Sequence, residues 1–557
     1  MQRDLNQLGQ EEFDLLIVGG GIYGATAARE AALAGLRVAL IEANDFAAGT
    51  SGNSLKIVHG GLRYLQHADL KRMRESIAER KILLRIAPHL VHPLPCVMPT
   101  YGHAIKGPEV MRVAMLMNDV LSADRNFGLD AEHRLPMGKV LSRAQFLDLV
   151  PHVDQTRLNG GAVWYDATMY NSERLALAFV RAAAENGAAV ANHLAAESFL
   201  MAAGRVGGVR ARDAIGGGTV EIRARQTLTC GGPWINDLFA QLGERRPPAQ
   251  AFSTALNLVV KRRLSDTYAF GVNCKKEFKD RDALIKKGSR LLFVVPWRDY
   301  TMIGTDHRPW KGTAGDYRVS EADIAAFLKD ANDAMPGAEI RRDEVTFFYG
   351  GLLPMAGVNA ASGDVSITKH FRIYDHEKEQ GIPGLLSVLS VKYTTARGVA
   401  EAAVRAAGRK LGRRLNSGRG RKTPVWGGDV GDFAGFLATQ QAERPQGMSA
   451  AQLEQLARNY GTGLGDVLKT AGEMEAGLRP LAGQEKVLRA EVSHAVRREM
   501  ALTLADVVLR RTELGSGEYP GDAAVTEAAA IMAAELGWDA ARVAQELAAL
   551  RARYQPI

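Results

Sequence analysis

The sequence predicts an α/β protein with a separate helical domain at its C-terminal end. Three observations support this prediction. The first 42 residues read as a strand, a glycine-rich turn, a helix and a second strand. Residues up to about 415 then alternate strand-like runs with helical ones, and from about 425 apolar residues recur at helical spacing almost throughout. A chain of 557 residues is long enough for two or three domains.

The bulk composition is that of a basic globular protein, although its net charge is small for its length. Hydrophobic residues make up 46% of the chain and charged residues 24%, and the formal net charge is +8. This charge favours phosphorylated substrates, acidic lipid surfaces or nucleic acid as partners. The three cysteines form no C-x-x-C pair, so we expect a reducing compartment, the cytoplasm. We expect neither a signal peptide nor a membrane-spanning segment.

The N-terminal segment carries the most specific motif of the chain. The apolar run FDLLIV, residues 13–18, predicts a buried strand, and Gly19, Gly21 and Gly24 follow it as G-x-G-x-x-G. Gly19 permits a tight turn, Gly21 lets the backbone approach a pyrophosphate, and Gly24 lets the next helix lie close to the strand. The second strand ends at Glu42, placed to accept hydrogen bonds from ribose hydroxyls. The pattern predicts a dinucleotide site. Because an acid repels a 2′-phosphate, NADP is disfavoured, whereas FAD and NAD stay open.

The C-terminal part reads as a helical domain that follows a basic linker. Residues 408–428, GRKLGRRLNSGRGRKTPVWGG, have no apolar period, which predicts a linker or a surface crossover. Because aromatic residues for base stacking are nearly absent from it, we expect no nucleic-acid partner. Beyond the linker, Ser449 and Gln452 predict a capping box. The glycines that end helical patterns are Gly461, Gly515 and Gly537.

One string, KIVHGGLRYL at residues 56–65, is unusual. Gly60 and Gly61 lie between His59 and the pair Arg63 and Tyr64. Adjacent glycines are unfavourable inside a helix or a strand, so the backbone is bare for another reason. An arginine fork binds phosphate or carboxylate oxygens, and an imidazole can remove a hydroxyl proton. We therefore interpret the string as part of a site.

Several segments resemble one enzyme family. Residues 49–66, GTSGNSLKIVHGGLRYLQ, are similar to the T-S-x-x-S-S-K-L-I-H-G-G-L-R-Y-L-E pattern of the FAD-dependent glycerol-3-phosphate dehydrogenases. CGGPWIND, VVPWRDYTMIGTD and KYTTARGVAE resemble later segments of that family, and the likeness covers residues 12–555. It implies a glutathione-reductase-like FAD-binding fold with a mixed α+β substrate domain and a C-terminal helical domain. The implied FAD-binding domain is 1–424, interleaved with substrate parts near 90–170 and 250–345, and the helical cap is 425–557.

The resemblance also implies a reaction. FAD, held without a covalent link, takes hydride at flavin N5 from C2 of sn-glycerol 3-phosphate or a related polyol phosphate, and electrons pass to quinone at a membrane. The implied partners are a small-molecule alcohol or polyol phosphate, a quinone or other electron acceptor, and a membrane surface touched peripherally. The implied location is the cytoplasm or the inner face of the cytoplasmic membrane. The oligomeric state stays open, with a dimer as one option.

The resemblance assigns roles to side chains on both sides of the expected flavin. Besides the fingerprint residues, the cofactor-binding residues that it implies are Thr50, Ser51, Ser54, His59, Gly60, Gly61, Gly231, Lys392, Thr394 and Thr395. The residues that it implies for catalysis are His59, Arg63, Tyr64 and Lys392. A lysine there can stabilise negative charge on the reduced flavin or bind an anionic substrate. The structural alternatives are a packed histidine, a surface salt bridge for the arginine, and a solvated lysine.

On the substrate side, the sequence departs from the family pattern. Asn257 stands where the family has a histidine, and Leu353 and Lys369 stand where it has arginines. Residues 390–391 read Ser-Val instead of Gly-Gly. The substrate-binding residues that we predict are Arg63, Tyr64, Asn257, Leu353, Lys369 and Lys392.

These changes leave the substrate open. Because a charge-assisted hydrogen bond contributes about 1.5–3 kcal/mol, losing an arginine weakens phosphate binding. Asparagine is no base, so proton removal would pass to His59, a lysine or water. The alternative substrates are a larger polyol phosphate, a different polyol or a 2-hydroxy acid. A non-catalytic flavin-binding scaffold and a nicotinamide-dependent dehydrogenase are the other functional alternatives.

Residues 69–86, DLKRMRESIAERKILLRI, predict a basic amphipathic helix. Its apolar residues near one face are Leu70, Met73, Ile77 and Leu84. We expect this face to pack on its own domain, with contact to anionic lipid as the alternative. No metal site is predicted, because His89 and His92 lack the helical i, i+4 spacing and lie between prolines.

Overall fold

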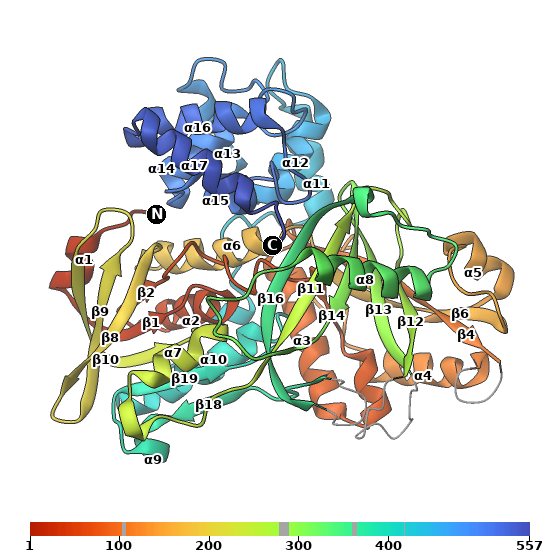
Figure 1. Ribbon diagram of the computed structural model, residues 1–557, viewed down its shortest axis with the longest axis horizontal. Helices are drawn as coiled ribbons and strands as arrows, with labels where there is room; N and C mark the ends of the chain where they lie inside the picture. Colours follow the sequence, from red (N-terminus) through yellow and green to blue (C-terminus); the bar gives the residue numbers. More distant parts are fainter. Residues whose placement is uncertain (103–106, 278–288, 359–364, 417) are drawn as a thin grey trace.

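The computed structural model describes residues 1–102, 107–277, 289–358, 365–416 and 418–557. The side chains of Arg63, Gln66, His67 and of residues 275–277 and 289–290 also lie outside this description. Two β-sheets stand beside each other, and a helical domain lies above the first sheet and the near edge of the second in Figure 1. The predicted α/β fold class with a C-terminal helical region is therefore confirmed.

The first sheet is mainly parallel and contains the predicted strand–helix–strand unit. Its strand order is β18-β19-β10-β1-β2-β7, and β9 and β8 extend it from β10. The strands are β1 (Glu12–Val18), β2 (Val38–Ile41), β7 (Ala189–Ala191), β8 (Leu194–Ala202), β9 (Arg205–Asp213), β10 (Thr219–Thr229), β18 (Arg372–Asp375) and β19 (Leu385–Leu389). β1 runs parallel to both β10 and β2. It is buried from Phe13 to Val18, as expected for a strand covered on both faces.

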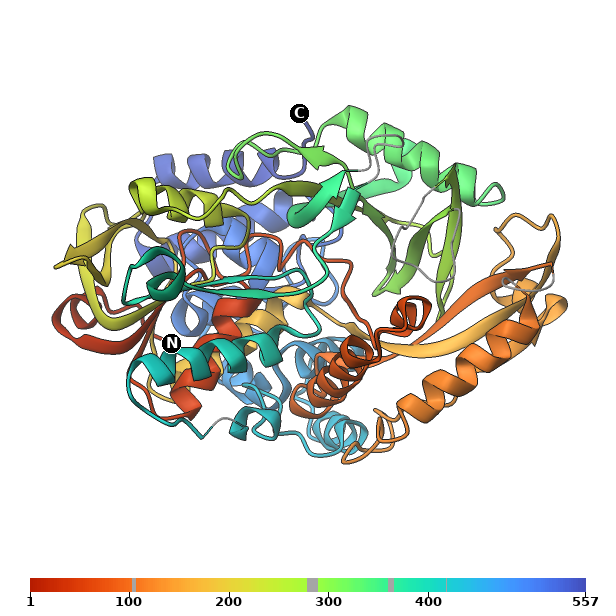
Figure 2. The same cartoon turned by 90° about the horizontal axis from the view of Figure 1, so that it is seen from below.

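Helices cover this sheet closely. α2, rich in alanine, packs between α6 and α10, and all but one of its residues are buried. Figure 2 shows these helices grouped against the sheet. The helices around the first sheet are α1 (Leu5–Gln10), α2 (Ile22–Leu33), α6 (Ser172–Glu185), α7 (Ile235–Ala240), α9 (His376–Gln380) and α10 (Ala396–Lys410).

The second sheet is mixed and mostly antiparallel. Its strand order is β17-β16-β11-β14-β13-β12-β4-β6-β3. The strands are β3 (Ile57–Val58), β4 (Val91–Tyr101), β5 (Lys139–Ser142), β6 (Leu158–Met169), β11 (Phe252–Val260), β12 (Ala269–Glu277), β13 (Ser289–Trp297), β14 (Tyr300–Asp306), β15 (Pro309–Trp310), β16 (Val345–Val358) and β17 (Val365–Ile367). The helices that accompany it are η1 (Leu62–His67), α3 (Leu70–Ile86), α4 (Pro108–Leu121), α5 (Arg143–Leu149) and α8 (Glu321–Ala334).

The C-terminal domain is helical, and all but one of its predicted caps are found at the predicted residues. Its elements are α11 (Phe433–Ala442), α12 (Ala450–Tyr460), α13 (Leu464–Gly472), α14 (Arg489–Glu499), α15 (Leu504–Asp506), η8 (Val507–Arg511), α16 (Asp522–Leu536) and α17 (Ala540–Ala552). Ser449 and Gln452 form the predicted capping box. Gly537 ends α16 with a φ of 69°, a conformation that favours glycine.

One predicted helix end was wrong. The helical pattern expected to run to Gly515 stops earlier, because α15 passes into a π-helix, η8, that ends at Arg511. The Thr512 amide and hydroxyl both donate to the carbonyl of Val507, at 3.0 and 2.8 Å. These two bonds close the last turn before Gly515 is reached.

The basic helix α3 packs on its own domain as expected. Of the four apolar residues named for its face, Met73, Ile77 and Leu84 are buried, whereas Leu70 is 45% exposed. The exposed apolar face belongs to α4, for which the sequence raised no expectation. Its residues Val113, Leu116 and Val120 are 58%, 60% and 67% exposed.

Candidate active site

The predicted dinucleotide residues meet at one edge of the first sheet. Gly19 follows β1, Glu42 follows β2, and Gly231 lies just beyond the end of β10. Ser390 follows β19 in the same way. Because these strands are parallel, their carboxyl ends lie together, which is where open α/β sheets bind ligands. We call this edge the crevice.

The fingerprint glycines fit a cradle that side chains would close. Gly19 has a φ of 108°, and a Cβ on it would lie 2.5 Å from the carbonyl oxygen of Cys230. A Cβ on Gly24 would collide with the carbonyl oxygen of Gly19. A Cβ on Gly21 would press against Oγ of Ser51. The bare backbone at the start of α2 therefore suits the close approach of a pyrophosphate.

Polar groups line this cradle. The Glu42 carboxylate accepts hydrogen bonds from the amides of Gly20 at 2.6 Å and Asn44 at 2.9 Å. A carboxylate has about four acceptor positions, so it can still accept from ribose hydroxyls. Oγ of Ser51 accepts from the amide of Ile22 at 2.9 Å, at the N-terminus of α2. The residues present thus fit the adenosine and pyrophosphate parts of a dinucleotide such as FAD.

The loop that carries Thr50, Ser51 and Ser54 is fastened at several points. The Thr50 hydroxyl donates to the carbonyl of Leu352 at 3.0 Å, and Oγ of Ser54 accepts from the amide of Lys56 at 3.3 Å. Lys56 is fully buried, and its ammonium lies 2.9 Å from the carboxylate of Glu173. A buried cation paired in this way fixes the chain where it turns toward His59.

His59 forms a buried-acid pair that the sequence did not predict. Its Nδ1 lies 3.1 Å from Asp166, which also accepts from the amide of Gly60 at 2.6 Å and from Arg80 at 2.8 Å. Burial alone would raise the pKa of Asp166, but the His59 hydrogen bond and the charge of Arg80 lower it to about 2. An ionised carboxylate only accepts, so Nδ1 of His59 carries the hydrogen and Nε2 is left to accept a proton. The ring is 48% exposed and so is open to a substrate.

The two adjacent glycines have structural reasons of their own. A Cβ on Gly60 would collide with the guanidinium of Arg80, which is fixed by Asp166 and by the carbonyl of Tyr165 at 2.6 Å. Gly61 has a φ of 90°, and a Cβ on it would lie 2.7 Å from the ring of Tyr64. The bare backbone is therefore required by this packing, in addition to any flat ring that lies against it.

Lys392, three residues after the end of β19, lies against Tyr64. Nζ of Lys392 is 4.0 Å from the centre of the Tyr64 ring. Burial, and then the charge of Arg72, lower the pKa of Lys392 to about 8. The Tyr23 hydroxyl donates to the carbonyl of Lys392 at 2.6 Å, which ties α2 to this segment.

The two threonines mark the end of the same segment. Oγ1 of Thr394 accepts from the amide of His59 at 3.1 Å, and Thr395 is the residue before α10. Residues 390–395 therefore connect the first sheet to the segment that carries His59. The side chain of Arg63 lies outside the described residues, although its backbone belongs to η1.

The substituted positions differ in their surroundings. Asn257 is 2% exposed, and its amide both donates to the carbonyl of Asn53 at 3.2 Å and accepts from Thr305 at 2.7 Å. These bonds favour a role in fastening the cofactor loop over contact with substrate. Leu353 lies on β16 opposite Ser253. The carbonyl of Lys369 accepts from Arg72 at 3.3 Å.

Sequence reasoning missed Asp166, Arg80 and Arg72. A signal for Asp166 was available, since a lone acid inside the apolar strand pattern of residues 162–169 needs a buried partner. Arg80 and Arg72 lie on α3 among several basic residues, and the local sequence does not distinguish them from the basic residues that face solvent.

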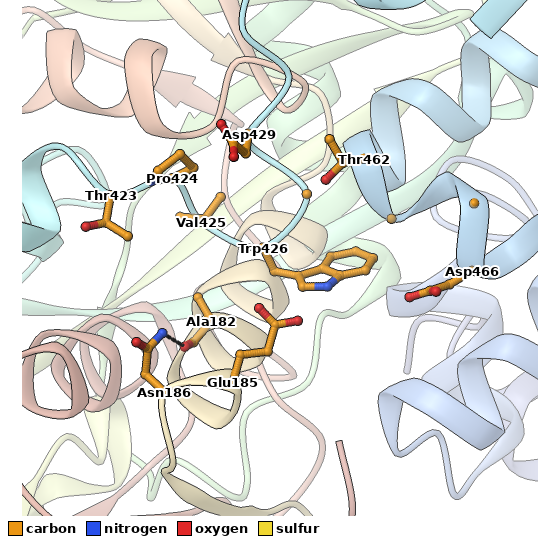
Figure 3. Close-up of a pocket in the computed structure, with 13 residues that line it drawn as sticks. Ala182, Glu185, Asn186, Thr423, Pro424, Val425, Trp426, Asp429, Thr462 and Asp466 are labelled. Atoms are coloured by element: carbon orange, nitrogen blue, oxygen red, sulfur yellow. Dashed lines mark hydrogen bonds between the residues drawn. The ribbon is translucent and has the colours of Figure 1, made fainter.

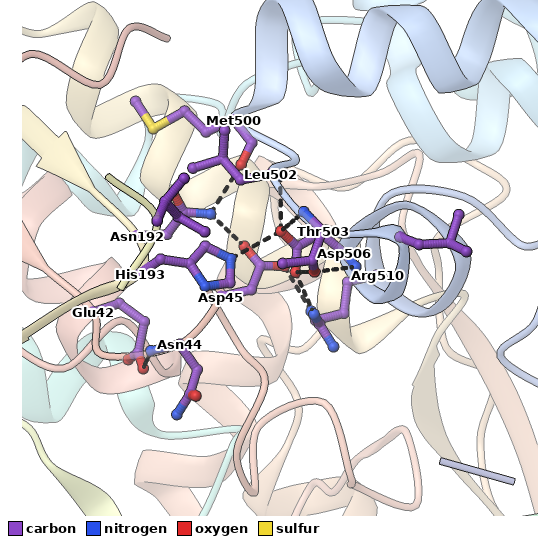
Figure 4. A network of polar contacts seen from close by, with 12 residues as sticks. Glu42, Asn44, Asp45, Asn192, His193, Met500, Leu502, Thr503, Asp506 and Arg510 are labelled. Atoms are coloured by element: carbon purple, nitrogen blue, oxygen red, sulfur yellow. Dashed lines mark hydrogen bonds and ion pairs between the residues drawn. The ribbon is translucent and has the colours of Figure 1, made fainter. Parts of the chain in front are cut away.

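A buried polar cluster joins the helical domain to the first sheet (Figure 4). Asp45 accepts from Arg510 at 2.6 Å, from Arg511 at 2.6 and 2.7 Å, and from Asn192 at 2.8 Å. Asp506 accepts from Arg510 at 2.6 Å and from His193 at 2.9 Å. Asp45, His193 and Asp506 lie close enough together to hold a metal ion. Their carboxylates are already paired with guanidinium groups, however, so we interpret the cluster as a domain contact.

A separate cavity lies away from the crevice, between α6 and the helical domain (Figure 3). It measures about 470 Å³, and its lining includes Trp426, Glu185, Asp429 and Asp466. The lining of the cavity carries three carboxylates, one of which, on Asp466, lies 4.0 Å from the guanidinium of Arg181. It shares no residue with the predicted site.

The fold and the crevice define an oxidoreductase that binds a dinucleotide. Residues 14–406 match the family model of FAD dependent oxidoreductases, and residues 419–543 match the C-terminal domain of alpha-glycerophosphate oxidase. The chain is 32% identical to the glycerol-3-phosphate dehydrogenase of Mycobacterium leprae over 554 residues, which covers 99% of this chain and 89% of that protein. The chain therefore belongs to the FAD-dependent glycerol-3-phosphate dehydrogenase family. The predicted family, enzyme class and FAD cofactor are confirmed.

Two further relatives agree with this assignment. A glycerol-3-phosphate dehydrogenase of Synechocystis sp. is 29% identical over 522 residues, covering 92% of this chain and 90% of that protein. The structure of the glycerol-3-phosphate dehydrogenase from Bacillus halodurans complexed with FAD matches with a TM-score of 0.75. It covers 99% of this chain and 96% of that chain at 23% identity, and this likeness supports the fold.

Proposed function

We propose that this chain oxidises the secondary alcohol of sn-glycerol 3-phosphate, or of a related polyol phosphate, with FAD as the hydride acceptor and quinone as the final acceptor. The observation that carries the proposal is the His59–Asp166 pair, because the amide of His59 also donates to Thr394, two residues after Lys392. Family membership supports the same reaction class. A base, a cofactor crevice and cations for an anion together suit a phosphorylated alcohol.

The crevice residues would hold FAD without a covalent link. Gly19, Gly21 and Gly24 would admit the pyrophosphate to the N-terminus of α2, and Glu42 would accept from the adenosine ribose. Thr50, Ser51 and Ser54 would contact the phosphates or the ribityl chain. Gly60 and Gly61 would face the flavin ring. Gly231, Thr394 and Thr395 would line the rest of the cofactor site. FAD bound there supplies a flavin that accepts a hydride from carbon.

His59 would take the hydroxyl proton of the substrate. Its Nε2 is the acceptor once Asp166 holds Nδ1–H, so the proton moves from the alcohol oxygen to Nε2 as the carbonyl forms. Asp166 stabilises the resulting imidazolium, and the exposed ring can then release the proton to solvent. Asn257 would play no part in this transfer, because both of its polar ends are engaged.

Lys392 and Tyr64 would hold the anionic end of the substrate, together with Arg63 and Lys369. Partial burial strengthens the attraction between the Lys392 ammonium and an anion. The same ammonium can stabilise charge that develops on a reduced flavin.

A membrane surface would give access to quinone. Among the described residues, no helix is both long and apolar enough to cross a bilayer. The exposed face of α4, here defined as Val113, Leu116, Met117 and Val120, offers a peripheral contact instead. Arg112 on α4 and Lys139 on the neighbouring β5 are exposed beside it and would attract anionic lipid. We infer the inner face of the cytoplasmic membrane as the location.

The deciding experiment is anaerobic bleaching of the bound flavin. The purified holoenzyme is mixed with sn-glycerol 3-phosphate, with larger polyol phosphates, and with unphosphorylated polyols and 2-hydroxy acids. Bleaching by sn-glycerol 3-phosphate at a rate that supports turnover is the expected result. Selective bleaching by a hydroxy acid would instead support the altered-substrate alternative, which the changes at Leu353 and Lys369 motivate. A yellow protein that none of these alcohols bleaches would contradict both.

A further inference from the structure

The phosphate-binding arginine implied by the family resemblance is missing on β16. Leu353 occupies its position, and a leucine side chain offers no donor to an anion. If the substrate carries a phosphate, another cation has to meet it. Lys369, at the second arginine position, presents a single ammonium where the family has a planar fork.

A cation from a different element lies beside the predicted substrate residues. Arg72, on α3, bonds through Nε to the carboxylate of Asp69, and its Nη1 donates to the carbonyl of Lys369 at 3.3 Å. Its guanidinium carbon is 4.9 Å from the centre of the Tyr64 ring, which Lys392 also approaches. Only 11% of the Arg72 side chain is exposed, so its position is fixed by packing.

The surroundings of Arg72 favour a role in binding an anion over a purely structural role. Its Nη2 has no hydrogen-bond partner within the described part of the chain. Arg72 and Lys392 carry the same charge and both lie against Tyr64. The charge of Arg72, after burial, also lowers the pKa of Lys392, and Glu75 and Asp69 offset this only in part. An anion between the two cations would remove their mutual repulsion.

We propose that Arg72 binds the phosphate of the substrate in this chain and replaces the arginine that is missing at Leu353. The proposal rests on the proposed function, because it places a phosphate monoester beside Tyr64 and Lys392. The guanidinium fork matches two phosphate oxygens, and Nη2 is the donor still available for them. The specificity for a phosphorylated alcohol then comes from α3, although the residue at β16 is apolar.

The experiment compares Arg72→Gln with a matched control on the same helix. Arg74→Gln removes an arginine two residues away, whose side chain is 43% exposed and pairs with Asp124 at 2.7 Å. Steady-state kinetics with sn-glycerol 3-phosphate and a soluble dye acceptor give KM and kcat separately. Inorganic phosphate serves as a competitive inhibitor, and its binding is also read from the flavin absorbance of the holoenzyme.

The expected result is a selective loss of anion binding. In Arg72→Gln, KM and the inhibition constant for phosphate both rise roughly tenfold to a hundredfold, since a charge-assisted hydrogen bond is lost. kcat changes much less, and Arg74→Gln behaves as the wild type. Arg72→Lys keeps the charge but loses the fork, so its KM and inhibition constant lie between those of the wild type and those of Arg72→Gln.

Wild-type values of KM and of phosphate inhibition in an FAD-loaded Arg72→Gln variant would overturn the proposal. If Arg72→Gln does not retain FAD, the same comparison is made with Arg72→Lys, and an unchanged KM then counts against it. A wild-type flavin that sn-glycerol 3-phosphate does not bleach would refute the proposed function alone. In that case, the phosphate titration of wild type and variant still decides the role of Arg72.

Discussion

Asp166 holds Nδ1 of His59 at 3.1 Å from within a buried strand, and the same carboxylate is fixed by Arg80 at 2.8 Å. This arrangement sets the imidazole tautomer, so Nε2 is the nitrogen that can accept a proton. The ring is half-exposed and Asp166 is buried, so one partner is accessible from outside while the other is shielded from water. The pair therefore has the geometry of a base with an orienting acid.

Asp166→Asn is expected to lower kcat about 100-fold or more, because a base held in the wrong tautomer loses most of a general-base contribution. The pH profile of kcat should also shift, which a purely structural defect would not produce. Stopped-flow reduction of the flavin measures the effect directly. Asp130→Asn is the matched control, since Asp130 pairs in the same way at 2.9 Å with His133, which the proposed reaction does not use. Equal losses in both variants would show that the His59 pair has no special role.

We expect Lys392 to make substrate binding depend on pH in the alkaline range. Burial and the charge of Arg72 lower its pKa to about 8, with Asp69 and Glu75 opposing them. Below that value the ammonium is charged and attracts an anionic substrate, and above it the attraction is lost. We expect kcat/KM for sn-glycerol 3-phosphate to fall as the pH rises through about 8.

Lys392→Arg keeps the charge at high pH, so this alkaline fall should move beyond the measurable range. The fall should persist in Lys378→Arg, in which an exposed lysine next to Asp375 is changed. An identical alkaline fall in the Lys392 variant would assign the titration to another group. Rates are compared at constant ionic strength, because salt screens the attraction under study.

The local parts of the site followed from the sequence. The strand, Gly19, Gly24, the helix and Glu42 all lie within a short segment, and each has a backbone requirement that reads directly from the residue type. The C-terminal capping box at Ser449 was predictable for the same reason. The family resemblance added the cofactor and the enzyme class, which spacing alone left open between FAD and NAD.

The contacts of the site that depend on tertiary packing could not be predicted from the sequence. Asp166 reaches His59 only because β3 pairs with β6, and 107 positions separate the two residues along the chain. Arg72 lies beside Tyr64 because α3 folds back over η1. The cause of the bare backbone at Gly60 was also hidden, since Arg80 fills that space from α3. Such contacts depend on tertiary packing, which a local pattern does not encode.

Gly60→Ala should destabilise the fold as well as the site. The added methyl group would collide with Arg80, whose guanidinium is held by Asp166 and Tyr165 and cannot move aside without breaking those bonds. Overpacking of this kind costs about 1–3 kcal/mol. Thermal unfolding of the holoenzyme measures the loss. Gly465→Ala serves as the control, because a Cβ there meets open space, and its Tm should stay close to that of the wild type. A wild-type Tm for Gly60→Ala would contradict the packing argument.

The contact between the helical domain and the first sheet should depend on pH through His193. Although burial opposes it, the hydrogen bond to Asp506 raises the pKa of His193, while His193 and Arg510 lower that of Asp506. The raised histidine pKa adds stability that is complete below its ordinary value near 6.5 and is lost as the pH rises through the folded value. The lowered acid pKa adds stability that is lost only in strong acid.

His193→Gln should therefore lower Tm most at mildly acidic pH and least above the folded pKa of His193. Differential scanning calorimetry between pH 5 and 9 would follow the difference. His152→Gln is the control, because the ring of the partly exposed His152 bonds to a backbone carbonyl, that of Gly337, at 3.1 Å. A Tm difference for His193→Gln that does not vary with pH would mean that the ion pair adds nothing beyond packing.

The exposed face of α4 should decide membrane association. Leu116→Ser with Val120→Ser removes two side chains that are 60% and 67% exposed. Partition onto anionic phosphatidylglycerol vesicles should weaken at least about tenfold, because each buried CH₂ contributes about 0.8 kcal/mol. Met201→Ser, which changes an exposed apolar residue on β8, should sediment with vesicles like the wild type. Activity with a soluble dye should be unchanged in the double variant, while activity with a vesicle-borne quinone should fall. Undiminished co-sedimentation of the double variant would place the membrane contact on another surface.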